Sequence, residues 1–420
     1  MESNNRNSII INFGCRLNAY ESEVIKSLVK KNSIQNTLIF NTCAVTKEAE
    51  RQAHQAIRKY KKIYPKMNVI VTGCSSQINP SKYLSMKEVN SIIGNDEKIK
   101  NETWSNLESV KYKKINNIMK VKRVNENIIN NFSDNSRAYV EIQQGCNHRC
   151  TYCIIPFGRG NSRSVPINII VKRIKTMVFN GFNEIVLTGV DITDYGIDLP
   201  GKPTFSNMVK RVLKMVPELK QLRLSSIDCA EIDDDFWDLI QHEERLMPHL
   251  HISLQSGDDL ILKRMKRRHN RKKAIKFCEK AKKLRPNIVF GADLIAGFPT
   301  ETDNMFDMTC SLIKECNLTY LHVFPYSQRI GTSANKMPQV SNEIKKSRGS
   351  FLRKLGEEQL SKYLKTLVGK EKTILIEKNI EGFSFGKTQE YAPVKINKIL
   401  EKRKLFNLAI KSENKKFLFA

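Results

Sequence analysis

The chain has 420 residues, 40% of them hydrophobic, and is therefore long enough for about two to four domains with ordinary apolar cores. Its apolar runs fall well short of the roughly 20 residues that cross a bilayer. Met1 to Ser8 is too polar for a signal peptide, so we expect a cytoplasmic protein. The ten cysteines then favour metal binding or catalysis over disulfides. The net charge of +28 favours a polyanionic partner such as nucleic acid, with a general bias toward Lys as the alternative.

Three apolar runs in the amino-terminal part each end at a cysteine. They are SIIINFGC, TLIFNTC and NVIVTGC, which end at Cys15, Cys43 and Cys74 with intervals of 28 and 31 residues. This spacing is typical of strand-helix-strand units of about 30 residues, and helical patterns lie between the runs, after Asn18 and over residues 48–62. Parallel strands bring their carboxyl ends to one edge of a sheet, so we expect the three thiols to meet there. Three equivalent cysteines favour a metal cluster, whereas a single one is more often a buried small side chain.

A polar stretch and then a long alternation of strands and helices follow. Residues 95–135 are rich in Lys and Asn, and we interpret them as a linker with one strand or so. The alternation predicts a parallel sheet, and its six units favour an open (β/α)6 barrel with its chemistry at the carboxyl ends of the strands. The expected strands are Ala138–Gln143, Glu184–Thr188, Gln221–Ser225, His249–Leu254, Val289–Ile295 and Tyr320–Phe324.

The segment CNHRCTYC stands directly after the first of these strands. Its cysteines, Cys146, Cys150 and Cys153, have the spacing C-x3-C-x2-C. Three thiolates so close together can hold one iron-sulfur cluster, and a [4Fe-4S] cluster then keeps one iron without a protein ligand. Such an open iron can bind a substrate or cofactor, as the open position of catalytic zinc does. A zinc knuckle or a chance grouping is the alternative interpretation.

Polar and basic segments surround this motif. LTGVD, LSSID, SLQSGDD and GADLIAGFPTE lie at later strand ends, where each Ser or Asp could alternatively be a helix N-cap. Arg159 and Arg163 follow the cysteine loop, and residues 265–271, MKRRHNR, are strongly basic. Arginine suits phosphate and stacks on bases, with a solvated helix face as the alternative.

The carboxyl-terminal part is the most basic. The last 90 residues carry 20 basic and nine acidic side chains. A helical pattern over residues 341–367 is followed from Lys372 by short strands with polar turns, which predicts a small β-barrel.

These motifs resemble a known family. The pattern C-x3-C-x-aromatic-C, with Tyr152 as its aromatic residue, resembles the signature of radical S-adenosylmethionine (SAM) enzymes. FGCRLNAYESE, NTCAVT with EAERQA, and VTGCSSQ resemble the amino-terminal domain of the radical-SAM methylthiotransferases, and Gly386, Lys387, Thr388 and Tyr391 resemble the RNA-binding TRAM module. The resemblance covers nearly the whole chain. GCRLNAYESE, CIIPFGRGNSRS, LTGVDITDYG and HVFPYSQRIGT are most similar to the branch that acts on N6-threonylcarbamoyladenosine beside the tRNA anticodon.

The resemblance implies an organisation, cofactors and site residues. Residues 1–110 would form an α/β domain with an open parallel sheet, 111–136 a linker, 137–366 the radical-SAM barrel and 367–420 a TRAM-like β-barrel. Cys15, Cys43 and Cys74 would hold an auxiliary [4Fe-4S] cluster, and the cysteines of CNHRCTYC a second one that binds SAM. Implied SAM contacts are Tyr152, Thr188, Gly189, Ser226, Gln255 and Asp293, and the expected RNA contacts are Arg159, Arg163, Arg267, Arg268 and Lys387.

The implied reaction inserts a methylthio group at C2 of N6-threonylcarbamoyladenosine at position 37 of tRNA. One SAM would supply the methyl group and a second would be cleaved reductively, because an unactivated aromatic C–H needs radical chemistry. We expect tRNA as the partner, an external electron donor of the flavodoxin or ferredoxin type, and a monomer. The alternatives are methylthiolation of isopentenyl-adenosine in tRNA or of a ribosomal-protein aspartate, and a non-enzymatic iron-sulfur or zinc RNA-binding protein.

Overall fold

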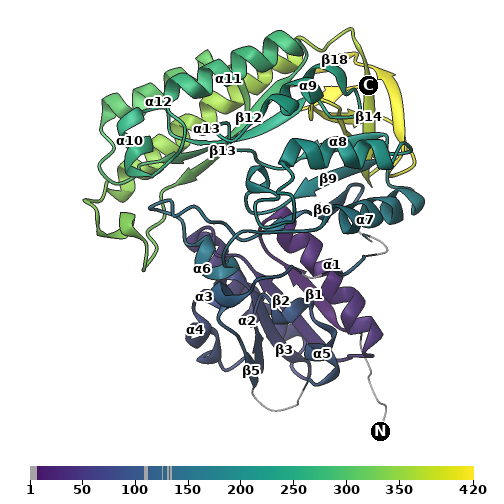
Figure 1. Cartoon of the computed structure of the whole chain (residues 1–420), viewed down its shortest axis with the longest axis vertical. Helices are drawn as coiled ribbons and strands as arrows, with labels where there is room; N and C mark the ends of the chain where they lie inside the picture. The colour runs from purple at the N-terminus through teal and green to yellow at the C-terminus, as the bar shows by residue number, and fades with distance from the viewer. Residues whose placement is uncertain (1–6, 108–111, 125, 130–131, 133–134) are drawn as a thin grey trace.

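The computed structural model describes residues 7–107, 112–124, 126–129, 132 and 135–420. Figure 1 shows an amino-terminal α/β part below, a larger strand-and-helix part above it, and a small sheet at the carboxyl end beside the larger part. Among the described residues, no helix combines the length and the apolar character that a membrane span requires.

The amino-terminal part is a five-stranded parallel sheet in the order β1-β2-β3-β4-β5. The expected helices are present, and the apolar face of α1 that contains Val24, Ile25, Leu28 and Val29 is buried. Thr46 caps α2 by accepting a hydrogen bond from the backbone N–H of Ala49. The strands are β1 Ile9–Asn12, β2 Thr37–Thr42, β3 Asn68–Gly73, β4 Ser91–Ile93 and β5 Tyr112–Lys114; the helices are α1 Arg16–Lys31, α2 Lys47–Ile63, α3 Cys74–Ile78, α4 Pro80–Leu84 and α5 Asn101–Ser105.

Residues 95–135, interpreted as a linker, contain one strand, one short helix and two 3-10 turns among the described residues. The strand is β5, which pairs with β4 and so extends the first sheet; the helix is α5, and the turns are Glu97–Ile99 and Ile118–Lys120. The predicted boundary between residues 110 and 111 lies outside the described residues, as do 125, 130, 131, 133 and 134 within the linker.

The central part contains all six predicted parallel strands. They form two three-stranded runs, β6-β9-β10 and β11-β12-β13. Isolated β-bridges connect the two runs, from Leu222 to Leu246 and from Ile227 to Ile252. Helices follow the strands, as an open (β/α)6 barrel requires. The strands are β6 Ala138–Glu141, β9 Glu184–Thr188, β10 Gln221–Leu224, β11 His249–Gln255, β12 Val289–Ala296 and β13 Leu318–Pro325; the helices are α6 Ile155–Arg159, α7 Ile167–Phe179, α8 Phe205–Met215, α9 Asp234–His242, α10 Asp259–Arg264, α11 Arg271–Leu284 and α12 Asp303–Glu315.

The carboxyl-terminal part begins with the predicted helix and ends in a curled sheet. Helix α13, Asn342–Lys365, packs on β13, and the sheet has the strand order β17-β14-β15-β16-β19-β18. The predicted small barrel is therefore present as a six-stranded half-barrel. Its strands are β14 Glu371–Ile380, β15 Phe383–Thr388, β16 Pro393–Ile396, β17 Leu405–Ala409, β18 Ser412–Glu413 and β19 Leu418–Phe419.

One apolar core joins the amino-terminal helix to the barrel. Tyr20 and Ile25 of α1 belong to the same buried cluster as Ala138 and Val140 of β6. The shared core fixes the first sheet against the barrel, so the carboxyl ends of both sets of strands have defined positions relative to one another.

Candidate active site

The three amino-terminal cysteines lie at the carboxyl ends of neighbouring strands. Cys15 follows β1 as the N-cap of α1, Cys43 follows β2, and Cys74 follows β3 as the first residue of α3. All three line one cavity of about 520 Å³, which we call the central cavity. Parallel pairing of the three strands therefore produces the meeting of thiols that the spacing predicted.

Glycine permits the close approach of these segments. Gly14 has φ +97°, and a Cβ built on it would lie 2.6 Å from the Sγ of Cys43. Gly73 has φ +103°, and a Cβ there would lie 2.2 Å from the carbonyl oxygen of Thr42. Both positions therefore require glycine.

The chemistry of the triad fits a metal cluster. The three thiols are free, and they are close enough to influence one another: burial first, and then Cys74 and Cys15, raise the pKa of Cys43 to about 12. Adjacent thiolates are costly without a cation, and soft thiolates are the ligands of iron-sulfur clusters. The donor set thus suits a [4Fe-4S] cluster better than a catalytic thiol.

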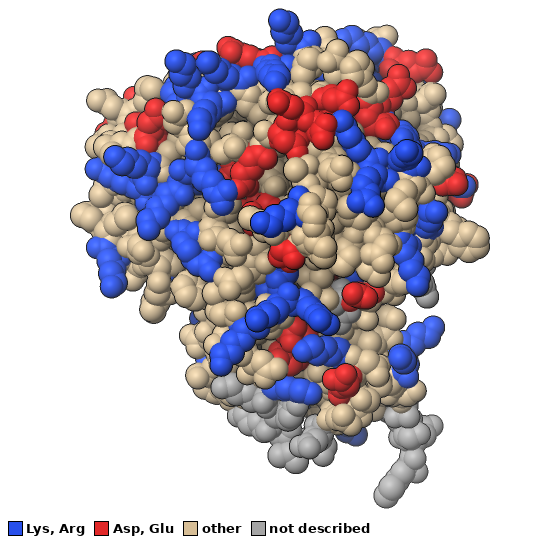
Figure 2. Space-filling model, in the orientation of Figure 1, with Lys and Arg blue, Asp and Glu red and all other residues tan. Residues whose placement is uncertain are grey.

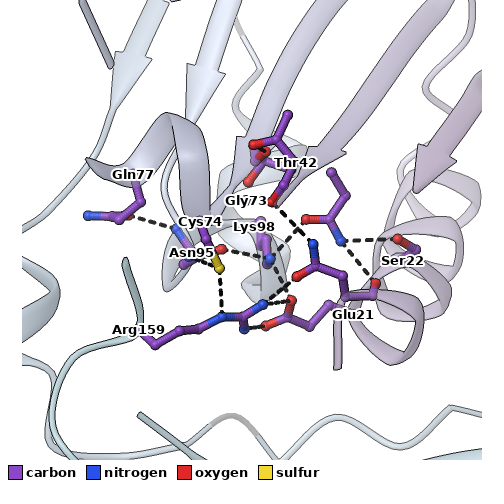
Figure 3. A network of polar contacts seen from close by, with 12 residues as sticks. Glu21, Ser22, Thr42, Gly73, Cys74, Gln77, Asn95, Lys98 and Arg159 are labelled. Carbon is purple, nitrogen blue, oxygen red and sulfur yellow. Dashed lines mark hydrogen bonds and ion pairs between the residues drawn. The ribbon is translucent and has the colours of Figure 1, made fainter. Parts of the chain in front are cut away.

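A buried polar network holds this triad to the loop of the second cysteine motif (Figure 3). Arg159, the last residue of α6, donates from Nε to Cys74 Sγ at 3.0 Å and from Nη2 to Glu21 Oε2 at 2.9 Å. Lys98 donates from Nζ to Glu21 Oε2 at 2.6 Å and to Asn95 Oδ1 at 2.7 Å. Arg159, Glu21 and Lys98 are each at most 2% exposed.

Two buried cations and one carboxylate leave this network with an excess positive charge. Burial alone would raise the pKa of the Glu21 carboxyl, but Arg159 and Lys98 outweigh burial and lower that pKa to about 2. The remaining positive charge lies against Cys74, so it favours an anionic sulfur or an anionic cluster there.

The second cysteine triad lies in one loop between β7, Gln143–Gln144, and α6. Arg267 donates from Nη1 to Cys150 Sγ at 3.7 Å and from Nη2 to Asp228 Oδ2 at 2.8 Å. Cys146 Sγ lies 3.6 Å from the carboxylate of Asp191. A buried, ion-paired arginine thus approaches this triad as Arg159 approaches the other.

The SAM contacts expected from the sequence line two adjoining cavities. Thr188, Gly189 and Ser226 line the central cavity, and Tyr152 and Gln255 line a smaller one of about 170 Å³ that also contains Cys153. Asp293 lines both. The six residues thus surround connected space beside both triads, and their roles as SAM contacts stay predictions.

Two histidines that were not among the predicted site residues, His251 and His322, line the central cavity beside Asp293. His251 Nε2 lies 3.0 Å from Asp293 Oδ1, and His322 Nδ1 lies 3.4 Å from the same oxygen. His322 is paired with Asp293 in the register of β12 and β13. The alternation of His249 and His251 along a predicted strand could have indicated that one of them faces the barrel interior.

The expected RNA contacts separate into buried and accessible groups. Arg159 and Arg267 bond cysteines and carboxylates, and Arg163 donates to the backbone carbonyls of Asn161 and Arg159. These three guanidiniums therefore have partners within the protein, and their contact with RNA stays a prediction. Each is at most 8% exposed as a side chain or residue, and a phosphate contact needs an accessible guanidinium. Arg268 is ion-paired with Glu231 but its side chain is 43% exposed, and Lys387 is partly buried with its Nζ 3.5 Å from the centre of the Tyr391 ring. The contact of these two residues with RNA also stays a prediction.

Charge on the visible face is spread rather than concentrated. Figure 2 shows Lys and Arg over both the upper and the lower parts, with acidic side chains among them. Basic side chains on this face are therefore interspersed with acidic ones rather than gathered in one patch.

The fold and the two cysteine sites define a radical-SAM protein. Residues 140–313, which include the cysteine loop, match the Radical SAM superfamily, and residues 7–94, which include the other triad, match Uncharacterized protein family UPF0004. The fold is similar to that of the radical SAM methyltransferase TsrM from Kitasatospora setae in complex with tryptophan and a SAM analogue, with a TM-score of 0.57, 12% identity and coverage of 79% of this chain and 75% of that one. The cobalamin-dependent radical enzyme OxsB with SAM bound has a TM-score of 0.51 and 10% identity, over 84% of this chain and 56% of that one.

Closer relatives define the family. The threonylcarbamoyladenosine tRNA methylthiotransferase MtaB of Rickettsia prowazekii is 53% identical over 96% of this chain and 94% of its own length. The enzyme of that name from Aquifex aeolicus is 33% identical over 87% of this chain and 92% of its own. A tRNA-2-methylthio-N(6)-dimethylallyladenosine synthase of Clostridium botulinum is 33% identical over 90% of this chain and 88% of its own. The chain belongs to the radical-SAM methylthiotransferase family, which confirms the family predicted from its motifs.

Proposed function

We propose that this protein inserts a methylthio group at C2 of N6-threonylcarbamoyladenosine at position 37 of tRNA. The observation that carries the proposal is the placement of two three-cysteine sites on adjoining cavities that share Asp293, in a chain 53% identical to a relative named for this activity. Transfer of a sulfur group to a ring carbon requires room for the base beside such a site, and the central cavity of about 520 Å³ supports this requirement.

We further propose two [4Fe-4S] clusters per chain, one on each triad, with SAM bound at the open iron of the loop cluster. A reduced cluster of this kind with SAM supplies a 5′-deoxyadenosyl radical, and a second SAM supplies the methyl group. The remaining work belongs to the protein, which must bind, orient and shield the reactants.

The side chains divide that work. Thr188, Gly189 and Ser226 would hold SAM from the central cavity, Tyr152 and Gln255 from the smaller one, and Asp293 from both. Tyr152 packs edge-on against Phe298, with ring centroids 6.4 Å apart, which keeps its ring beside the loop cysteines and limits water there.

Arg159 and Arg267 act on the two triads as positioning residues. Each donates to one cysteine sulfur and is held in place by a carboxylate, Glu21 or Asp228. Hydrogen bonds to cluster sulfurs raise reduction potentials, so these arginines adjust how easily each cluster accepts an electron.

We propose the same domain plan as from the sequence, with residues 1–110, 111–136, 137–366 and 367–420, in a monomeric cytoplasmic enzyme reduced by a flavodoxin or ferredoxin. The half-barrel, with the partly buried Lys387, and Arg268 would contact tRNA through phosphates, which gives affinity without reading sequence.

Mass spectrometry of nucleosides from bulk tRNA, in cells with and without this gene, tests the proposal. Loss of the gene should remove 2-methylthio-N6-threonylcarbamoyladenosine and accumulate its unmethylthiolated precursor. A plasmid copy should restore the nucleoside, and a copy with Cys43→Ala should not. Persistence of the nucleoside in the deletion strain would show that the substrate is wrong.

The second candidate substrate is dimethylallyladenosine in tRNA, because the Clostridium botulinum relative named for it also aligns over 90% of this chain. The same nucleoside profiles decide between them, since each substrate has a different methylthio product. A ribosomal-protein aspartate would leave both tRNA products unchanged and would appear instead in peptide mass spectra. The non-enzymatic alternative predicts no SAM cleavage when the purified protein is reduced.

A further inference from the structure

Arg16 occupies a distinctive position between two cavities. It is the first residue of α1 and directly follows Cys15. Its side chain lines the central cavity and also a second cavity of about 340 Å³ beside the carboxyl-terminal sheet, which we call the outer cavity. His251 and His322 line both cavities as well, so the two are contiguous at Arg16.

Arg16 has no counter-ion among the described residues. Throughout the part of the chain that the structure describes, its guanidinium forms no ion pair or hydrogen bond, although the residue is only partly exposed. The other arginine of the central cavity, Arg159, is paired with Glu21, and Asp293 there is paired with two histidines. A partly desolvated guanidinium without an anion is costly, and binding an anion removes that cost.

The surroundings of Arg16 increase the demand for an anion. Lys387 and Arg353 line the outer cavity, where the exposed Glu357 is the acidic side chain among the lining residues. Burial first, and then Arg223, His251, Arg16 and Lys387, hold the pKa of His249 well below its usual range. His249 therefore stays neutral, so it neither adds a positive charge to this region nor provides an anion for Arg16.

We propose that Arg16 binds the carboxylate of the threonylcarbamoyl group and so selects an adenine that carries an anionic substituent over one that carries an apolar substituent. The inference rests on the proposed function, in which the threonyl carboxylate is the one negative charge on the modified base. A guanidinium fork matches a carboxylate in two hydrogen bonds, whereas a dimethylallyl group offers it neither charge nor acceptor.

A backbone phosphate of the tRNA is the other anion that could reach this region. The location of Arg16 favours the carboxylate, because Arg16 lines the central cavity, which also contains Cys15, Cys43 and Cys74. Lys387 and Arg353 line only the outer of these two cavities. Phosphates follow the surface of the RNA, and the modified base must enter the central cavity to react.

Binding of three tRNAs that differ at position 37 separates these sources. The holoenzyme, without SAM or reductant, is titrated with one tRNA that carries unmodified adenosine, threonylcarbamoyladenosine or dimethylallyladenosine, at one salt concentration. The unsubstituted protein should bind the threonylcarbamoyl form roughly tenfold to a hundredfold more tightly than the unmodified form. Arg16→Gln should remove this preference and leave the other two affinities unchanged, and Arg16→Lys should keep part of it.

Arg353→Gln is the matched control, because Arg353 is an exposed cation of the outer cavity. Arg353→Gln should reduce the binding affinity for all three tRNAs by the same factor, or leave all three unchanged. Equal weakening of all three by Arg16→Gln would identify a phosphate contact and overturn the proposal. If the unsubstituted protein itself does not distinguish the three tRNAs, the proposed substrate fails, and the role of Arg16 fails with it. Iron content of each variant confirms that Cys15, the neighbouring ligand, is still occupied.

Discussion

The two cysteine triads present the same donors by different means. Cys15, Cys43 and Cys74 come from three strand ends that parallel pairing brings together, whereas Cys146, Cys150 and Cys153 share one loop. The first arrangement depends on tertiary structure and on a buried network around Glu21, and the second mostly on local chain geometry. A site assembled from distant segments should therefore be more sensitive to changes elsewhere in the domain than a site within one loop.

Replacing one cysteine in each triad should give the largest effect and separate two activities. Cys150→Ala should reduce SAM cleavage to background, because the open iron that binds SAM is lost. Cys43→Ala should keep reductive formation of 5′-deoxyadenosine but make no methylthio product. Chromatography of both products, with iron content per chain falling from about eight to about four in each variant, makes the test. Loss of SAM cleavage in both variants would contradict two independent sites.

Glu21→Gln should be the most destabilising change around the strand-end triad. It leaves Arg159 and Lys98 buried without their carboxylate, and breaking such a pair costs about 3–5 kcal/mol in the free energy of unfolding. Urea denaturation of the holoenzyme measures it. Glu23→Gln is the matched control on the same helix, since Glu23 pairs with Lys26, whose side chain is 33% exposed, and should cost at most about 1 kcal/mol. Similar costs for the two would show that the buried network is not required.

Low pH should reduce the free energy of unfolding by protonating the same carboxylate, that of Glu21. The folded-state pKa of Glu21 is about 2, below the unfolded value of about 4.3, so its contribution is fully present above pH 4.3. The contribution is lost as the pH falls from there toward 2. Unfolding free energies measured across this range should therefore converge for the unsubstituted protein and Glu21→Gln. A difference that persists at low pH would assign the effect of the substitution to packing instead.

The sequence predicts the two sites by different routes, because one lies within a single loop and the other is assembled from three strand ends. The loop site could be predicted from eight residues, and the strand-end site from the repeated pairing of an apolar run with a cysteine. Both depended on strands that the sequence located well. The roles of Arg159 and Arg267 could not be predicted, because the local sequence does not show whether a basic side chain near a motif is buried or exposed. The meeting of His251, Asp293 and His322 depends on the register of three strands, which no local pattern specifies.

A glycine substitution tests how tightly the strand-end triad is packed. Gly14→Ala places a methyl group against Cys43 and also strains a residue with φ +97°, so we expect a loss of about 1–2 kcal/mol from strain and lower iron occupancy of that triad from the contact. Gly331→Ala is the control, because Gly331 has φ +91° with open space where the Cβ would lie. Calorimetry and iron content together separate strain from contact. Equal iron loss in both variants would contradict a specific contact with Cys43.

The smallest expected effect distinguishes the two arginines. Arg159→Gln removes a hydrogen bond to Cys74, and Arg267→Gln removes one to Cys150. Each should lower the reduction potential of its own cluster by tens of millivolts at most and leave the other unchanged, because a hydrogen bond to sulfur stabilises the more negative, reduced cluster. Redox titration of the holoenzyme, followed by electron paramagnetic resonance, measures both potentials in one sample. Arg159→Gln should have the larger effect, since its Nε lies 3.0 Å from sulfur against 3.7 Å for Arg267 Nη1. If Arg159→Gln shifts both potentials together, the clusters are electrostatically coupled, and Arg159, which lies on the helix after the loop of one triad and bonds a cysteine of the other, contributes to that coupling.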